Sequence, residues 1–186
     1  MNPSAEQHYL LYNETELDKV IVAMARQCLS LFSPATPPIL VGMLRRGEPL
    51  AQRLQQQLRQ HWPQAPLPVF GLTLKRYADD LHLLHPETAL TDNPALLACD
   101  LASTSLLLVD DVLYQGHSLL RAVNWLVQHG ASCVRTAVLV DRGIAQLPLH
   151  ADVVGLHLQV PDNDVIECRV PPYEASFQVE IWHRPG

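Results

Sequence analysis

The stretch LLLVDDVLYQGHS, from Leu106 to Ser118, decides the fold class and places the candidate site. Its apolar residues run directly into two adjacent carboxylates, Asp110 and Asp111, and a glycine-containing loop follows. A short apolar run bounded by polar residues is typical of a central strand in a parallel sheet, and ligands of such sheets bind beyond the carboxyl ends of the strands. The two aspartates are therefore predicted to lie where a ligand binds.

A helix is predicted to follow this loop, from Ser118 to His129. Its apolar residues keep helical spacing, and Gly130 suits the position just after the last turn. The loop Tyr114 to Ser118 would then open the helix. Because a helix N-terminus offers unpaired backbone N–H groups and the positive end of the helix dipole, this loop is a candidate cradle for a phosphate group.

Plainer interpretations compete with a ligand site. An aspartate at a strand end often only forms a turn, and Ser118 by itself is a plausible helix N-cap. A Walker B strand also shows an apolar run before acidic residues, but no G-x-x-x-x-G-K-[ST] precedes this one, and lysine occurs only at Lys19 and Lys75. Two adjacent carboxylates repel each other unless a cation, hydroxyl donors or water satisfy them. A ribose or a hydrated Mg²⁺ meets that need, so the combined pattern favours a ligand site.

Helix and strand signals alternate along the chain, which indicates an α/β fold with a mostly parallel central sheet flanked by helices. The 186 residues, 48% of them hydrophobic, suit one domain over residues 1–186. Thr15 is expected to cap a first helix that extends to about Leu31. Further elements are expected as strands at 39–43, 69–77, 106–109, 134–140, 153–158 and 165–170, a helix at 48–60, and an edge strand over 177–181.

Residues 79–104 show no clear period. A segment of this length inside a compact domain favours a functional lid, which we expect at about residues 78–104.

Composition points to a cytoplasmic protein. No stretch approaches the roughly 20 apolar residues of a membrane span, and the first 19 residues lack a signal-peptide pattern. The four cysteines lie far apart without a C-x-x-C pair, so we expect reduced and mostly buried thiols.

Four stretches together resemble a known family. They read VGMLRRGEPLAQRL at 41–54, YADDL at 77–81, LVDDVLYQG at 108–116 and LVDRGIAQLPLHADVVG at 139–155. In this order they resemble the PyrR family of pyrimidine-operon regulators with uracil phosphoribosyltransferase activity, a branch of the type I phosphoribosyltransferases. The resemblance covers roughly residues 16–170. It implies a type I phosphoribosyltransferase-like fold with a flexible lid and a small hood, the hood being built from the C-terminal and lid-root segments.

The resemblance also implies an activity. The phosphoribosyl group of phosphoribosyl pyrophosphate (PRPP) would pass to uracil, giving the nucleoside monophosphate UMP and pyrophosphate. Mg²⁺ would be the cofactor, held mainly by the substrate near Asp110 and Asp111 and not by direct protein ligands. A homodimer or larger assembly and pyrimidine gene regulation through RNA are further family traits. RNA binding gains little support from a formal charge of −6 with 13 Lys plus Arg, and no membrane partner is expected.

Roles for the PRPP-binding residues follow from the resemblance. Asp110 and Asp111 would accept hydrogen bonds from the two ribose hydroxyls. The 5′-phosphate would meet the turn Gln115, Gly116, His117 and Ser118. The pyrophosphate loop would consist of Arg45, Arg46 and Gly47, for which a solvated surface pair of arginines is the plainer interpretation. The residues predicted to be catalytic are Asp110, Asp111, Arg46 and Arg76.

The lid and the base site complete the predicted set. Lid residues are Tyr77, Asp79 and Asp80, with Lys75 and Arg76 at the lid root. The base is expected to meet Asp141, Arg142 and the backbone near Val165 and Ile166. Related 6-oxopurine transferases carry a lysine at the position of Asp141, and an ionised aspartate cannot donate to a purine oxygen, which disfavours a purine. A local ion pair between Asp141 and Arg142 that shapes a turn is the alternative.

This sequence departs from the family pattern in three places. The phosphate loop usually reads T-G-R-T, whereas Gln115 and His117 replace its first threonine and its arginine. Ala78 replaces the lid arginine of Y-R-D-D, and Arg45 replaces the threonine of T-R-G. Two other functions therefore stay open: a catalytically weak regulator that senses PRPP or nucleotides, and a phosphoribosyltransferase for another base.

Overall fold

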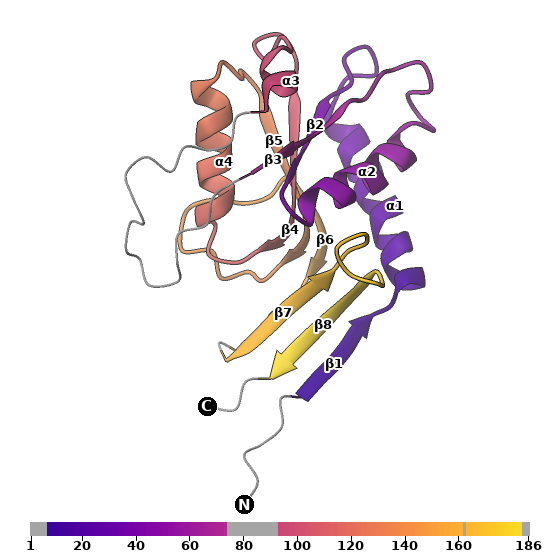
Figure 1. The fold of residues 1–186 in the computed structure, drawn as a ribbon, viewed down its shortest axis with the longest axis vertical. Helices are drawn as coiled ribbons and strands as arrows, with labels where there is room; N and C mark the ends of the chain where they lie inside the picture. Colours follow the sequence, from indigo (N-terminus) through magenta and orange to yellow (C-terminus); the bar gives the residue numbers. More distant parts are fainter. Residues whose placement is uncertain (1–6, 74–92, 162, 184–186) are drawn as a thin grey trace, which may run out of the picture.

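The computed structural model describes residues 7–73, 93–161 and 163–183 (Figure 1). Their helices and strands are, in chain order, β1 (Gln7–Tyr12), α1 (Glu14–Leu31), β2 (Ile39–Met43), α2 (Gly47–Leu58), β3 (Val69–Leu72), α3 (Pro94–Leu97), β4 (Leu106–Leu113), α4 (His117–Gln128), β5 (Val134–Asp141), β6 (Val153–His157), β7 (Asp164–Arg169) and β8 (Gln178–His183). None of the helices in these ranges is long and apolar enough to cross a membrane.

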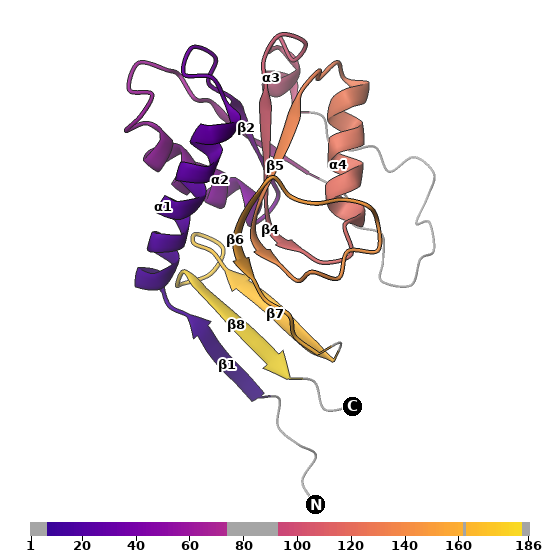
Figure 2. The same ribbon diagram turned by 180° about the vertical axis from the view of Figure 1, so that it is seen from behind.

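A five-stranded parallel sheet forms the centre of the molecule, in the order β3-β2-β4-β5-β6. Helices α1 and α2 lie on one side of this sheet and α4 lies on the other, as both ribbon views show (Figures 1 and 2). Strand β4 is fully buried from Leu106 to Val109, as an interior strand covered on both faces should be. The predicted α/β class with a mostly parallel sheet is confirmed.

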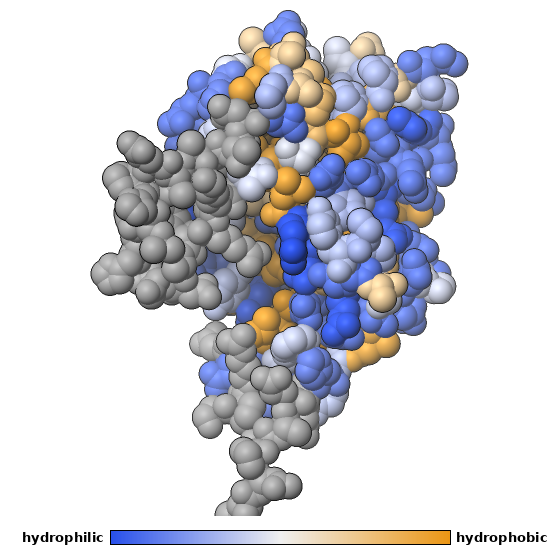
Figure 3. All heavy atoms as spheres, in the orientation of Figure 1, coloured by the Kyte–Doolittle hydropathy of each residue, from blue (hydrophilic) through white to orange (hydrophobic). Residues whose placement is uncertain are grey.

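Two apolar clusters, one on each side of the sheet, hold the helices. Leu17 and Met24 of α1 and Leu54 of α2 belong to one cluster, and Leu119 and Trp125 of α4 belong to the other. On the face seen in Figure 3, hydrophilic side chains prevail on the side of α2 and apolar side chains form smaller patches.

A second, three-stranded antiparallel sheet of order β1-β8-β7 packs below the carboxyl end of the main sheet (Figure 1). We refer to this sheet as the hood. We expected 177–181 to form an edge strand, and this was wrong, because β8 lies between β7 and β1. The partner on the far side, β1, comes from the N-terminal residues 7–12, which the sequence pattern had not marked as a strand.

The helix N-termini correct one expectation, the cap of the first helix, and remove one alternative, Ser118 as an N-cap. Asn13, not Thr15, caps α1: its Oδ1 accepts the Glu16 amide at 3.1 Å, while the Glu16 carboxylate accepts the Asn13 amide at 2.9 Å. Gly116 is the N-cap of α4, with a left-handed φ of 89°, so Ser118 lies inside the helix and does not cap it. Gly130, with φ of 98°, follows the helix end as predicted.

Part of the predicted lid segment is packed into the domain. Residues 93–104 contain the short helix α3, which is capped by Asn93, and Leu96 and Leu101 are buried in the core. These residues therefore belong to the body of the fold. The rest of the predicted lid, 78–92, lies outside the described residues, and the lid stays a prediction there.

We predict that Gly47 is essential for the close contact of α2 with β4. A Cβ at this position would lie 2.4 Å from the Val109 carbonyl oxygen, which is backbone and cannot move aside. Gly47→Ala should lower the free energy of unfolding by about 3 kcal/mol, the upper end for overpacking. Urea denaturation measures this loss. In the control Gly130→Ala, a Cβ meets open space and only the positive φ is strained, at about 1 kcal/mol; equal losses in the two variants would contradict the prediction.

Candidate functional site

The candidate site lies where the strand order of the main sheet reverses. The chain passes from β2 outward to β3 and then returns to the other side of β2 as β4. Pairing between β2 and β4 ends at Gly42 and Val109. In open parallel sheets a crevice forms at such a reversal, beyond the carboxyl ends of the strands.

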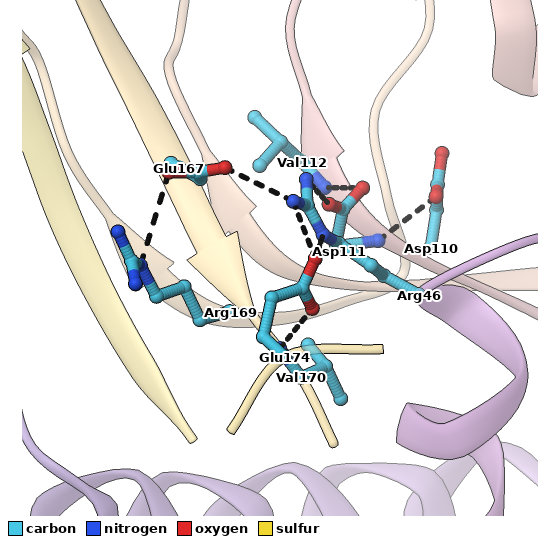
Figure 4. Close-up of polar contacts among 8 residues, drawn as sticks. All are labelled: Arg46, Asp110, Asp111, Val112, Glu167, Arg169, Val170 and Glu174. Atoms are coloured by element: carbon cyan, nitrogen blue, oxygen red, sulfur yellow. Dashed lines mark hydrogen bonds and ion pairs between the residues drawn. The ribbon is translucent and has the colours of Figure 1, made fainter. Parts of the chain in front are cut away.

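Asp110 and Asp111 lie inside β4, which is longer than the predicted strand and extends to Leu113. Both aspartates are half-buried. Each also accepts a local backbone hydrogen bond: Asp110 Oδ1 from the Asp111 amide and Asp111 Oδ1 from the Val112 amide, both at 2.9 Å. These bonds fix the carboxylates against the strand and leave Asp111 Oδ2 directed toward Arg46 (Figure 4).

Arg46 is surrounded by carboxylates. Its Nη2 donates to Glu174 Oε1 at 2.8 Å and to Glu167 Oε1 at 3.1 Å, and its Nε donates to Glu174 Oε1 at 3.1 Å. Its Nη1 lies 3.7 Å from Asp111 Oδ2. Arg46 therefore joins the loop after β2, strand β4 and the hood (Figure 4).

These contacts shift the pKa values of both partners. Burial by itself would lower the pKa of Arg46, but the hydrogen bond to Glu174 and the charges of the surrounding carboxylates outweigh it and raise the pKa above its ordinary value. Burial would likewise raise the pKa of Glu174, but hydrogen bonds from Arg46 and from the Val170 amide hold it below its ordinary value of 4.5. Both groups are thus charged at neutral pH.

Arg45 and Gly47 complete the predicted pyrophosphate loop. The Arg45 guanidinium lies over the ring of Tyr173, 5.4 Å from its centroid, and the Arg45 residue is exposed. The Leu44–Arg45 peptide bond is cis. Both arginines of the loop therefore contact the same short segment of the hood, Tyr173 and Glu174.

The predicted phosphate loop opens α4 at the end of β4. Gly116 is buried beside Leu147 and Leu149, and the Gln115 carbonyl accepts the Gln146 amide at 3.3 Å. His117 and Ser118 are exposed in the first turn of the helix. The loop is therefore held from one side by residues 146–149, while the first turn of α4 remains accessible.

Asp141 and Arg142 lie at the carboxyl end of β5, and they point to different partners. Asp141 Oδ1 accepts the Gly143 amide at 2.7 Å, which closes a local turn. Arg142 is 5% exposed, its guanidinium lies 4.6 Å from the Tyr114 ring centroid, and its Nη2 donates to the Pro161 carbonyl at 3.4 Å. The ion pair considered between the two residues does not appear among the contacts of these described side chains.

Strand β7 carries Val165 and Ile166 at an edge of the hood. Ile166 is 7% exposed and packs into the core, so only its backbone is available to a ligand, whereas Val165 is half-buried. Cys168, two residues further, is fully buried, and burial raises the pKa of its thiol well above the ordinary value, with a further contribution from the charge of Asp111. Burial raises the pKa of the Cys28 thiol to about 12. All four cysteines are free thiols, but only Cys28 and Cys168 are buried, whereas Cys99 and Cys133 are partly buried.

The structure thus brings the adjacent pair Asp110 and Asp111, called the diacid below, to the same edge of the sheet as Arg46 and the start of α4. Sequence reasoning missed Glu167, Tyr173 and Glu174. The alternation of Ile166, Glu167 and Cys168 could have placed Glu167 opposite the buried pair, but Tyr173 and Glu174 lie in a turn without such a pattern. Five predicted lid and lid-root residues lie outside the described residues: Lys75, Arg76, Tyr77, Asp79 and Asp80.

Comparison with known proteins shows the family to which this chain belongs. A family model described as a phosphoribosyl transferase domain matches residues 8–175. The chain therefore belongs to the phosphoribosyltransferase family, and within it the chain is PyrR-like. It is 33% identical over 167 residues to the bifunctional protein PyrR of Herpetosiphon aurantiacus, covering 89% of this chain and 92% of that protein. It is 32% identical over 180 residues to the bifunctional protein PyrR of Thermus aquaticus, covering 95% and 96%.

Solved structures agree on the fold. The hypoxanthine phosphoribosyltransferase of Trypanosoma cruzi in complex with the product IMP superposes with a TM-score of 0.69 at 14% identity, covering 98% of this chain and 94% of that one. A hypoxanthine-guanine phosphoribosyltransferase of Bacillus anthracis gives 0.67 at 14% identity, covering 94% and 99%. The predicted type I phosphoribosyltransferase fold is confirmed.

We predict a pH-dependent contribution of Glu174 to stability. Because its pKa is lower in the folded chain than the ordinary 4.5, its stabilising effect is complete above that value and is lost as the pH falls through the folded pKa. Glu174→Gln should therefore melt at a lower temperature than the wild type at pH 7, and the gap should narrow below about pH 4.5. Thermal melts from pH 7 to pH 3 measure the gap, and a gap that stays constant over this range would refute the prediction.

Proposed function

We propose that this protein transfers the phosphoribosyl group of PRPP to uracil, giving UMP and pyrophosphate. One observation carries the proposal: Asp110–Asp111, Arg46 and the first turn of α4 lie at the same carboxyl edge of a parallel sheet. Carboxylates suit ribose hydroxyls, a guanidinium suits pyrophosphate, and a helix N-terminus suits a 5′-phosphate. The three parts of PRPP thus have one matching group each.

The reaction needs no protein nucleophile. The bond between the anomeric carbon and the pyrophosphate oxygen breaks, and the pyrophosphate leaves with the electron pair. The uracil nitrogen forms the new bond to that carbon and gives up its proton to water. The chain would contribute orientation of the ribose through the two aspartates and stabilisation of the leaving charge through Arg46.

Mg²⁺ fits this proposal as a companion of the substrate. Among the described residues there is no group of three or more His, Cys, Asp or Glu side chains that could hold a metal ion. Asp110 and Asp111 place negative charge beside the expected position of the substrate, and Mg²⁺ keeps several water ligands and commonly binds together with substrate phosphates. Bound in this way it would neutralise charge on the departing pyrophosphate.

Uracil as the base is supported by Asp141 and by the resemblance to the PyrR family. An ionised aspartate accepts hydrogen bonds but cannot donate one to a purine oxygen. Because β7 is an edge strand of the hood among the described residues, its outer edge can offer backbone donors and acceptors to a pyrimidine near Val165 and Ile166. The two structural neighbours are named for purine bases, hypoxanthine and hypoxanthine-guanine, so a purine is the competing base to test.

A second candidate is a regulator that binds PRPP or a nucleotide in the same site and turns over slowly. His117 stands where the family has an arginine, and it is exposed in the first turn of α4. Phosphate would then be held mainly by backbone N–H groups.

The base is identified by a panel of radiolabelled uracil, hypoxanthine and guanine with PRPP and Mg²⁺. We expect labelled nucleotide from uracil at a rate at least tenfold above either purine, because a wrong hydrogen-bonding edge leaves buried polar groups unpaired. Faster product from a purine would refute uracil specificity. PRPP binding without any product would favour the regulator.

The diacid is tested by replacing both aspartates with asparagine. Asp110→Asn with Asp111→Asn preserves shape and removes two charges, so charge-assisted hydrogen bonds worth roughly 1.5 to 3 kcal/mol each are lost. PRPP affinity should fall on the order of 10- to 100-fold per residue, before non-additivity, in a calorimetric titration with Mg²⁺. Thermal melts report whether the variant folds. A folded double variant with wild-type affinity would end the PRPP-site assignment.

A further inference from the structure

The turn after β7 reaches back to the pyrophosphate loop. We call residues 170–174 the hood latch. Its last residue, Glu174, uses both carboxylate oxygens: Oε1 accepts from Nε and Nη2 of Arg46, and Oε2 accepts the Val170 amide at 2.8 Å. The side chain of Glu174 is 18% exposed and that of Arg46 is 27% exposed. The pair is therefore shielded from most of the solvent. A partly buried ion pair is screened by salt much less than an exposed one.

The edge of the Arg46 guanidinium that would bind a phosphate, formed by Nε and Nη2, is already occupied. A guanidinium binds a phosphate best through two parallel N–H groups, and in Arg46 the Nε and Nη2 groups both donate to Glu174. Glu167 takes a further bond from Nη2, and Asp111 approaches Nη1. Three carboxylates thus face Arg46, and Arg169 lies 3.9 Å from the far oxygen of one of them, Glu167 Oε2 (Figure 4). A pyrophosphate cannot use the same edge unless Glu174 gives it up.

We infer that Glu174, assisted by Glu167, is an internal anion that occupies the pyrophosphate-binding edge of Arg46 and that the substrate's pyrophosphate must displace. This inference rests on the proposed function, since it takes Arg46 as the pyrophosphate ligand. Glu174 is then a residue that sets affinity for PRPP and pyrophosphate without touching either. It also makes the hood latch sensitive to occupation of the site, because the same side chain holds the Val170 amide.

Glutamine is the informative replacement for Glu174. Its amide oxygen can still accept the Val170 N–H, so the turn keeps its internal hydrogen bond. The neutral side chain no longer holds Arg46 by charge and no longer repels an incoming anion. Removing a competitor should strengthen anion binding, whereas removing a group that orients Arg46 for the ligand should weaken it. The direction of the change therefore separates the two roles.

The experiment is a calorimetric titration of the full chain with inorganic pyrophosphate at fixed Mg²⁺ concentration and neutral pH. We expect Glu174→Gln to bind pyrophosphate about tenfold more tightly than the wild type, which corresponds to about 1.4 kcal/mol. Glu167→Gln removes the charge of the carboxylate that takes one bond from Arg46, whereas Glu174 takes two, so Glu167→Gln should show a smaller gain. The control Glu14→Gln makes the same change in net charge at the exposed start of α1, where Glu14 pairs with Arg53, and should leave affinity unchanged.

Unchanged or weaker binding in the folded Glu174→Gln variant would overturn the inference. Thermal melts establish folding, and if Glu174→Gln does not fold, Glu167→Gln decides, because it leaves the bond between Glu174 and Val170 in place. An equal gain in Glu14→Gln would show a general charge effect and also overturn it. If the wild type binds neither pyrophosphate nor PRPP, the proposed function fails. If the wild type binds pyrophosphate but the Glu174→Gln and Glu167→Gln variants bind it no more tightly, only the inference that Glu174 is an internal competitor is refuted, and the proposed function stands.

Discussion

The close packing of the α2 N-terminus on the backbone of β4 is the constraint on which the site depends. Gly47 lies so near the Val109 carbonyl that a Cβ would approach it to 2.4 Å, and this brings the preceding arginines beside the strand end. Asp111 is two residues beyond that carbonyl, so Arg46 and Asp111 come within 3.7 Å. A glycine and a strand reversal thus place opposite charges together before any ligand is present.

Charge then couples the hood to the main sheet. Arg46 belongs to the loop after β2, whereas Glu167 and Glu174 belong to the hood, and their bonds of 2.8 to 3.1 Å link the two. A buried charge without a partner is costly, so each side stabilises the charged form of the other. The raised pKa of Arg46 and the lowered pKa of Glu174 express this coupling. Any anion that binds Arg46 must therefore also act on the hood.

Elements with strong local signals could be predicted from the sequence. The apolar run at Leu106 and the glycines at 116 and 130 gave the central strand and helix α4 because burial and positive φ are local requirements. β1 and the central place of β8 could not be predicted, since the partner strands lie at opposite ends of the chain. The contacts of Glu174 and Tyr173 depend on how the hood turn meets the Arg45–Arg46 loop, which no local pattern encodes.

The alternation along β7 shows how burial fixes this charged contact. Ile166 and Cys168 insert into the apolar cluster that also holds α1 and α2, and this sets the rotation of the strand. Glu167, between them, must then point to the opposite face, where Arg46 lies. A one-residue slip of β7 would bury the carboxylate and expose the apolar pair, at a large cost in free energy. The same apolar contacts that attach the hood to the domain therefore hold its carboxylates against the site.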